Sequence, residues 1–90
     1  MKILCVCGLG MGSSLILKMS VEDVLSEAGV KADVEHSDAS AAMTERCDYI
    51  VTTSDIAKLL QGAKGEVIVC NSFIDKVEIK RVLVNGGVIS

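Results

Sequence analysis

A glycine-rich stretch between a strand-like segment and a helix-like segment is the feature that most constrains the fold. The apolar run Ile3–Val6 has the length and β-branched content of a buried strand, and the segment from Leu15 to Ala28 is amphipathic. Three glycines within five residues allow a tight turn, because glycine has no Cβ atom to obstruct the backbone. The stretch therefore predicts a strand–turn–helix unit. Its members are Cys7, Gly8, Leu9, Gly10, Met11, Gly12, Ser13 and Ser14.

The same stretch has the composition of an anion site. Backbone N–H groups of a glycine turn and of a helix start can converge on a phosphate-sized anion. Cys7 opens the turn, and a thiol at a helix N-terminus has its thiolate form favoured, which makes it a nucleophile. We therefore interpret Cys7 as a phosphocysteine site and Gly8 to Ser14 as its phosphate-binding loop. Ser13 and Ser14 can add hydroxyl donors or cap the helix.

Composition argues against several classes of function. The chain has 90 residues, half of them apolar, which predicts a single domain over residues 1–90. A net charge of −3 without a basic run argues against nucleic acid as a partner. No apolar run approaches membrane-spanning length, so we expect no direct membrane insertion. Four cysteines, and no room for a signal peptide before Lys2, indicate free thiols and a cytoplasmic protein. No cluster has zinc spacing, and we expect neither a metal nor another cofactor.

Strand and helix patterns alternate along the chain. Strands are expected at Lys2–Val6, Val30–His36, Tyr49–Thr53 and Glu66–Cys70, and helices from Ser13 or Ser14 to Ala28, at Ser37–Glu45, at Asp55–Leu60, and from a cap at Asp75 through Val84. This order predicts a Rossmann-like, three-layer α/β domain with a parallel sheet and helices on both faces. The first and third strands are apolar throughout and belong in the middle, so the predicted sheet order is 2-1-3-4. That order puts Cys7 at the switch point between strands one and three.

The helices carry recognisable core stripes. In the first helix the stripe is Leu17, Val21, Val24, Leu25 and Ala28, and Gly29 ends the helix. In the third helix we expect Ile56, Leu59 and Leu60 to face inward. The last segment is rich in β-branched residues, so a strand is the alternative there.

Other interpretations of the glycine-rich stretch are weaker. A dinucleotide fingerprint would need its third glycine at Ser13, and a nucleotide P-loop would need a Gly-Lys-Ser/Thr sequence. Thiol redox through Cys5 and Cys7 would need a strained Cys-x-Cys disulfide, and Cys5 is better explained as a buried small residue. A tight turn without chemistry is a further alternative.

The main alternative is a low-molecular-weight phosphatase or arsenate reductase. Its signature is Cys, five residues, Arg, and then Ser or Thr. Here the spacing from Cys7 is kept, but Ser13 occupies the arginine position. Arginine clamps a phosphate bidentately and offsets its charge in the transition state, so its loss argues against hydrolysis.

The stretch Val6 to Ser14, continued by Leu-Ile-Leu-Lys-Met to Met19, resembles the enzyme IIB proteins of the bacterial phosphoenolpyruvate-dependent sugar phosphotransferase system (PTS). The run Cys-Gly-x-Gly-x-Gly-Ser-Ser is most similar to the L-ascorbate type. The resemblance in length and element order covers the whole chain, while the specific matches cluster in its first part.

The resemblance implies a phosphotransferase component and phosphoprotein that acts in sugar transport. Cys7 would take a phosphoryl group from a phosphohistidine on a IIA protein or domain, and would pass it to a sugar bound by the membrane-embedded IIC partner. The protein would then be cytoplasmic and peripherally associated with IIC.

Several residues outside the turn complete the hypothesis. Leu9 and Met11 alternate with glycines, and we interpret them, together with Phe73, as docking contacts for IIA and IIC. His36 is interpreted as an ordinary strand-end histidine, with a role beside Cys7 as the alternative. Asp55 is expected to cap a helix rather than to face the site. Cys47 and Cys70 are expected to be buried apolar residues.

Overall fold

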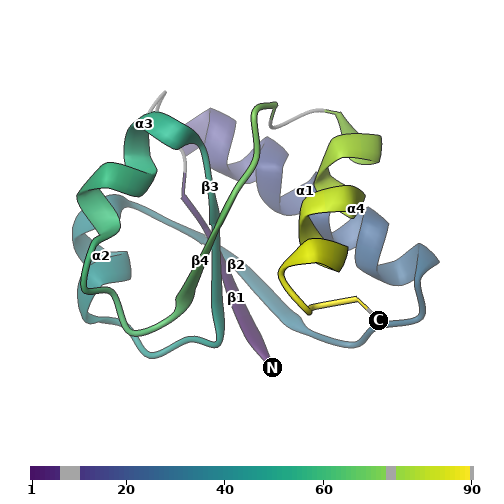
Figure 1. Cartoon of the computed structure of the whole chain (residues 1–90), viewed down its shortest axis with the longest axis horizontal. Helices are drawn as coiled ribbons and strands as arrows, with labels where there is room; N and C mark the ends of the chain where they lie inside the picture. Colours follow the sequence, from purple (N-terminus) through teal and green to yellow (C-terminus); the bar gives the residue numbers. More distant parts are fainter. Residues whose placement is uncertain (7–10, 73–74, 90) are drawn as a thin grey trace.

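The chain folds into a parallel sheet with helices on both faces (Figure 1). The computed structural model describes residues 1–6, 11–72 and 75–89, without the side chains of Met11 and Ser13. The strands are β1 (Lys2–Val6), β2 (Asp33–Ser37), β3 (Tyr49–Thr52) and β4 (Glu66–Val69). The helices are α1 (Met11–Glu27), α2 (Ala39–Thr44), α3 (Ser54–Ala57), the 3₁₀ turn η1 (Lys58–Leu60) and α4 (Lys76–Asn85).

The strand order confirms the predicted sheet. It is β2-β1-β3-β4, and each neighbouring pair is parallel. Val6, the last residue of β1, is in register with Ser37 of β2 and Thr52 of β3. The carboxyl ends of the strands meet at one edge of the sheet, which is at the top of Figure 1.

Two separate cores explain why β1 is apolar from Ile3 to Val6. Ile3 and Cys5 belong to the core under α1 and α4, whereas Leu4 and Val6 belong to the core under α2, α3 and η1. The figure shows these two pairs of helices on opposite sides of the sheet (Figure 1). Every β1 side chain from residue 3 to residue 6 is therefore buried, as expected of a central parallel strand.

Packing on the α1 face follows the predicted stripe. Leu17, Val21, Val24 and Leu25 are buried, and Ala28, beyond the end of the helix, is exposed. Gly29 has a φ of 73°, which lets the backbone N–H of Val30 reach the carbonyl oxygen of Leu25 at 2.9 Å. The predicted helix stop is confirmed.

Two predicted boundaries are wrong in an informative way. Helix α1 starts at Met11, so neither Ser13 nor Ser14 is its N-cap. The first-turn N–H groups of a helix need no acceptor within it, so glycine and serine can form that turn at small cost. Strand β2 starts at Asp33 rather than Val30, because Val30 still belongs to the turn that ends α1.

The remaining helices show what local sequence can determine. Asp38 caps α2 through a 2.7 Å bond from the N–H of Ala41, and Asp75 caps α4 by accepting from Val77 and Glu78. The last segment is therefore a helix and not a strand.

The predicted orientation of Leu59 is wrong. Leu60 is buried, but Leu59 is 62% exposed because residues 58–60 form a 3₁₀ turn. With three residues per turn, two successive leucines point about 120° apart and cannot both reach the sheet.

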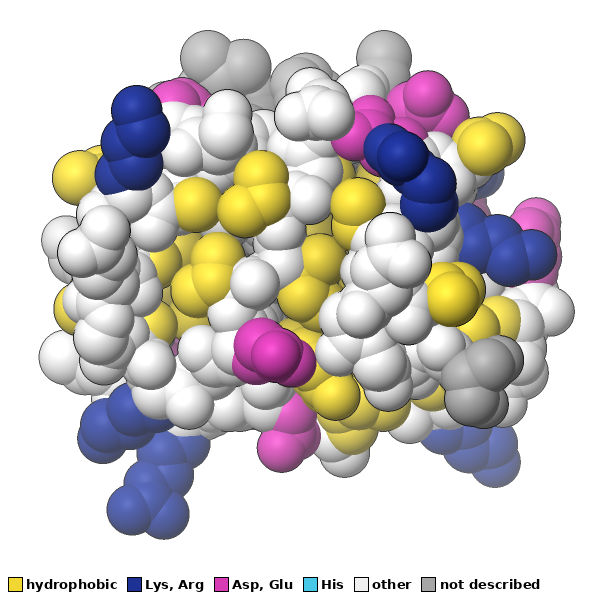
Figure 2. Space-filling view, viewed as in Figure 1, with side chains coloured by type: hydrophobic (Ala, Val, Ile, Leu, Met, Phe, Trp, Pro, Cys, Tyr) yellow, Lys and Arg dark blue, Asp and Glu magenta, His cyan; other side chains and the backbone are white. Residues whose placement is uncertain are grey.

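The two edge strands differ in their surfaces. β2 carries the exposed acidic residues Asp33 and Glu35, which discourage the addition of another strand. β4 is short, and Figure 2 shows hydrophobic side chains at the surface in the middle of the face where β4 lies in Figure 1. Val69 at its end is 39% exposed.

Replacing Gly65 with Ala should destabilise the fold by about 1–3 kcal/mol, because it overpacks the start of β4. A Cβ atom there would lie 2.6 Å from Cys47 Sγ and 3.2 Å from the Cys47 carbonyl oxygen. Urea unfolding measures the loss. Adding Cys47→Ala removes the sulfur contact and leaves the carbonyl contact, so it should recover only part of the loss. A Gly65→Ala variant as stable as the wild type would contradict this packing.

Candidate functional site

The candidate site lies at the switch point between β1 and β3. After β1 the chain passes to α1 on one face, and after β3 it passes to α3 on the other face. Connections that diverge in this way leave a crevice at the carboxyl ends of parallel strands, which is where α/β domains bind ligands. Cys7 follows the last residue of β1 directly in the sequence. Of the predicted site, Cys7, Gly8, Leu9, Gly10 and Phe73 lie outside the described residues.

The start of α1 supplies positive potential to this edge. The N–H groups of Met11, Gly12 and Ser13 lie in its first turn, so they have no acceptor within the helix. No acidic side chain lies in that turn, and the partial positive charge of the helix N-terminus is not offset there. Gly12 has open space around it, since a Cβ at that position would meet nothing within 4 Å. The predicted anion-binding loop is therefore partly helical, because Met11, Gly12, Ser13 and Ser14 belong to α1.

A buried hydroxyl lies on the β3 side of the switch point. Thr52 ends β3, is fully buried, and its Oγ1 has no hydrogen-bond partner within the described part of the chain. Its carbonyl oxygen accepts from the N–H of Cys70 at 2.8 Å, which fixes the backbone. Sequence reasoning did not single out this residue. The available signal was a lone hydroxyl at the carboxyl end of an otherwise apolar strand.

The neighbouring residues of α3 carry a structural interaction. Thr53 Oγ1 donates to Asp55 Oδ1 at 2.6 Å, and this bond lowers the pKa of the exposed Asp55 carboxyl group. Asp55 is the second residue of α3, so it is not the N-cap, but a negative charge in a first helical turn is favourable.

His36 lies on the other side of β1. It is the Cα partner of Cys5 and is half-buried on the α1 side of the sheet. It lines a cavity of about 500 Å³ together with Lys18, Glu22, Asp33, Val34 and Glu35. Cys5, the register partner of His36, comes two residues before Cys7 in the sequence. A role of His36 beside Cys7 stays a hypothesis.

Both arginines of the chain lie elsewhere. Arg46 lines a cavity at the opposite edge of the sheet, where the strands begin. Arg81 is exposed on α4 and pairs with Glu78 at 3.7 Å. Arg46 therefore belongs to the edge away from the switch point, and Arg81 is engaged on its own helix.

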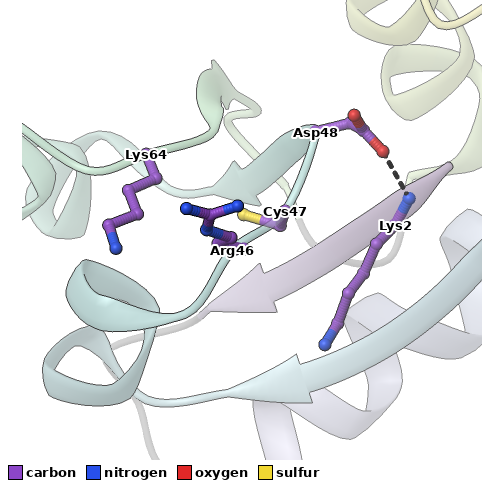
Figure 3. A pocket seen from close by; sticks show the side chains of 5 residues that line it. All are labelled: Lys2, Arg46, Cys47, Asp48 and Lys64. Carbon is purple, nitrogen blue, oxygen red and sulfur yellow. Dashed lines mark hydrogen bonds between the residues drawn. The ribbon is translucent and has the colours of Figure 1, made fainter.

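The cavity at the opposite edge has a volume of about 500 Å³ and is lined by Lys2, Arg46, Cys47, Asp48 and Lys64 (Figure 3). The backbone N–H of Lys2 donates to Asp48 Oδ2 at 2.7 Å, which is the dashed bond in the figure. The Lys2 ammonium group pairs with Glu45 at 2.7 Å and with Glu35 at 3.3 Å, and the hydrogen bond that it donates to Glu45 is the main reason its pKa is raised. The ammonium group of Lys2 is thus engaged in ion pairs with Glu35 and Glu45 that link parts of the fold.

The described thiols are unsuited to nucleophilic chemistry. The pKa of the Cys5 thiol is raised from 9.0 to about 12, mainly by burial, and the neighbouring Cys70 contributes to this shift. Cys70 is fully buried, as predicted, whereas Cys47 is only half-buried and burial raises its pKa too. A redox role for Cys5 is therefore disfavoured by its protonation state.

An apolar surface begins within the first two turns of α1. Leu15, Ile16 and Met19 are 43%, 44% and 58% exposed, although their helix has a separate buried stripe. We call these three residues the α1 apolar face. The sequence pattern contained this signal, since Leu15 and Ile16 precede the stripe that begins at Leu17, and Met19 falls between two of its positions.

Residues 1–6, 11–72 and 75–89 contain no group of three or more His, Cys, Asp or Glu side chains placed to hold a metal ion. Among them there is also no helix long and apolar enough to cross a membrane.

Comparison with known proteins supports this geometry. The family model described as "PTS system, Lactose/Cellobiose specific IIB subunit" matches residues 2–85. The ascorbate-specific PTS system EIIB component of Mycoplasma pneumoniae is 30% identical over 84 residues, which is 90% of this chain and 88% of that protein. The lactose-specific IIB component domain of Streptococcus pneumoniae has the same fold, with a TM-score of 0.59 at 16% identity, over 96% of this chain and 93% of that one.

A parallel α/β domain with this switch point and this family match is a phosphoryl carrier. The chain belongs to the PTS IIB family, and it is therefore a component of a sugar phosphotransferase. The match favours the carrier over the phosphatase among the two function classes that the sequence left open.

The raised pKa of Cys5 predicts a pH dependence of stability. The thiol ionises near 9.0 when unfolded but near 12 when folded, so the folded state holds the proton in that range. The stabilisation is full below about pH 9 and is lost as the pH rises toward 12, with a slope of at most about 1.4 kcal/mol per pH unit. Urea unfolding between pH 8 and 11 measures the slope. Cys5→Ala should be less stable throughout and should show a shallower fall; equal slopes would contradict the assigned protonation.

Proposed function

We propose that Cys7 is the phosphoryl acceptor of this IIB protein, and that it relays phosphoryl groups from a IIA protein or domain to a sugar held by a membrane IIC partner. The observation that carries the proposal is the family match over residues 2–85 together with the position of Cys7. In the sequence, Cys7 stands between the end of β1 and the uncompensated N-terminus of α1. The three described cysteines, Cys5, Cys47 and Cys70, lie in the cores or at the opposite edge.

The first step is a transfer from nitrogen to sulfur. The Cys7 thiolate attacks the phosphorus atom of an N-phosphohistidine on IIA. The S–P bond forms as the P–N bond breaks, and the imidazole nitrogen takes the electron pair and then a proton. The N–H groups at the start of α1 favour the thiolate before the transfer and the phosphoryl oxygens during it.

The second step is a transfer from sulfur to oxygen. A sugar hydroxyl oxygen attacks the phosphorus atom, the O–P bond forms as the S–P bond breaks, and Cys7 is regenerated as the thiolate. The hydroxyl proton passes to a base or to water. We propose L-ascorbate as the sugar, because the 30% identical relative is named as ascorbate-specific and the cysteine loop has the ascorbate-type pattern.

The absence of arginine at position 13 fits a relay better than a hydrolase. A bidentate guanidinium would stabilise the transition state for attack by water and would hold the phosphoryl group tightly. Neutral N–H donors bind the group while leaving it a reactive donor. Arg46 lies at the edge of the sheet where the strands begin, away from the proposed phosphoryl site, which agrees with a site of neutral donors.

Docking of partners requires an apolar surface beside the thiol. We propose that the α1 apolar face extends the predicted contacts Leu9, Met11 and Phe73 into one docking surface for IIA and IIC. Leu9 and Phe73 lie outside the described residues, and the side chain of Met11 does as well, so their contribution stays a prediction. Met11 itself is the first residue of α1, about one helical turn before the exposed Leu15. One surface that serves two partners in turn must bind each of them transiently. The protein would act on the cytoplasmic side of the membrane and would associate with it through IIC.

The Cys7 assignment can be tested by reconstituted phosphotransfer. Phosphoenolpyruvate, the general carrier proteins and a IIA protein should add one phosphoryl group to the wild-type chain, located at Cys7 by mass spectrometry. Cys7→Ala and Cys7→Ser should accept none, while their circular dichroism and urea unfolding stay close to those of the wild type. Cys5→Ala, which alters a buried thiol, serves as the matched control and should still be labelled. Label retained in Cys7→Ala and lost in Cys5→Ala would overturn the assignment.

The α1 apolar face should affect partner binding rather than chemistry. Met19→Gln and Leu15→Ser should each raise the IIA concentration for half-maximal transfer about fivefold, since burying part of one such side chain contributes roughly 1 kcal/mol. The maximal rate and the alkylation of Cys7 by a small reagent should not change. Val84→Gln alters a comparably exposed position near the C-terminal end of α4, and it should change neither the IIA concentration for half-maximal transfer nor the maximal rate. An equal effect of all three substitutions would argue against this docking surface.

A further inference from the structure

The hydroxyl group of Thr52 is a polar group without a structural use. It is fully buried, and within the described part of the chain it neither donates nor accepts a hydrogen bond. Most buried hydroxyl groups have a partner, because leaving one unpaired removes its hydration without any return. Valine has nearly the same shape and would fill the same space without this cost. The hydroxyl group therefore needs another explanation.

Its position suggests that explanation. Thr52 is the last residue of β3 and is in register with Val6, which immediately precedes Cys7. It is held from both sides, because β3 pairs with β1 on one side and the Thr52 carbonyl oxygen accepts from Cys70 N on the other. A hydroxyl on such a fixed strand end is preorganised, so it would lose little entropy on meeting an acceptor.

The charge distribution indicates what the acceptor is. Arg46 lies at the opposite edge of the sheet, and Arg81 pairs with Glu78 on α4. The described donors at the switch point are the neutral N–H groups at the start of α1. A phosphoryl group on Cys7 brings oxygens that need several donors, whereas the unphosphorylated protein has no such need. The N–H groups of α1 approach from one face of the sheet. The alternation along β3 puts Thr52 on the other face with Ile50, in the direction of α2 and α3.

We propose that Thr52 is a phosphoryl-binding residue whose Oγ1–H donates a hydrogen bond to a phosphoryl oxygen on Cys7. The inference rests on the proposed function of Cys7 and adds a side-chain donor to it. The hydroxyl group is unpaired in the free protein and paired in the phosphorylated protein. It thus stabilises the phosphorylated form relative to the free form, and it sets the balance of phosphoryl groups between IIA and this protein.

The test compares Thr52→Val with Thr52→Ser in the full chain. With a limiting amount of phospho-IIA, the equilibrium share of phosphoryl groups on each protein is measured by mass spectrometry. Thr52→Val should shift the equilibrium constant toward phospho-IIA about tenfold, as expected for one hydrogen bond to a charged acceptor. Thr52→Ser keeps the hydroxyl group and should stay near the wild-type value. Thr44→Val removes a hydroxyl that donates to the Ala41 carbonyl oxygen on exposed α2, and it should not change the equilibrium.

A second measurement separates this role from packing. Unphosphorylated Thr52→Val should unfold at the same or a higher urea concentration than the wild type, because it loses an unpaired buried hydroxyl. A clear loss of stability would mean that the hydroxyl already has a partner in the free protein, and the inference would fall. If Thr52→Val does not fold, Thr52→Ser and Thr52→Ala form a second pair that differs only in the hydroxyl.

The remaining outcomes are also decisive. An unchanged equilibrium in Thr52→Val, or equal shifts in Thr52→Val and Thr52→Ser, would overturn the inference and leave Cys7 as the acceptor. A wild-type protein that accepts no phosphoryl group, or Cys7→Ala that still accepts one, would overturn the proposed function itself and the inference with it.

Discussion

The parallel pairing of β1 with β3 is the constraint on which the candidate site depends. Parallel strands align their carboxyl ends, so Val6 and Thr52 lie at the same edge of the sheet. The chain then leaves the two strands toward opposite faces, and the connections cannot fill the space between them. Both cores stabilise this pairing, because the side chains of β1 alternate between them. The energy that holds the site together is therefore mostly hydrophobic, although the site itself is polar.

A carrier must bind a phosphoryl group without keeping it, and the arrangement at this edge is consistent with that need. The described donors are the neutral N–H groups at the start of α1, to which the proposed contact from Thr52 adds a neutral hydroxyl. The charged side chains Lys2 and Arg46 lie at the opposite edge, where Lys2 is paired with Glu35 and Glu45. Lys2 and Arg46 thus lie where the strands begin, whereas the donors proposed for the phosphoryl group, at the strand ends, are neutral.

The sequence was a good guide to the parts of the fold that follow from periodicity and caps. The order 2-1-3-4 followed from two apolar strands, and the cap Asp75 is where the sequence indicates. The start of α1 and the exposure of Leu59 were not predictable in this way. Each depends on how a turn winds locally, which neither the serine signal nor the apolar pattern specifies. In the site, Cys7 follows from its motif, but the isolation of the Thr52 hydroxyl depends on everything packed around it.

The two helical layers differ greatly in the length of their helices, and this difference affects how easily each layer opens. The layer formed by α2, α3 and η1 consists of segments of six, four and three residues, and α3 has no buried residue at all. The opposite layer contains α1 with 17 residues and α4 with ten. Segments with few buried contacts open locally at a small fraction of the global unfolding free energy. The switch point therefore lies between a stiff layer, which carries α1 and the proposed docking surface, and a compliant layer, which can open locally without disturbing the first.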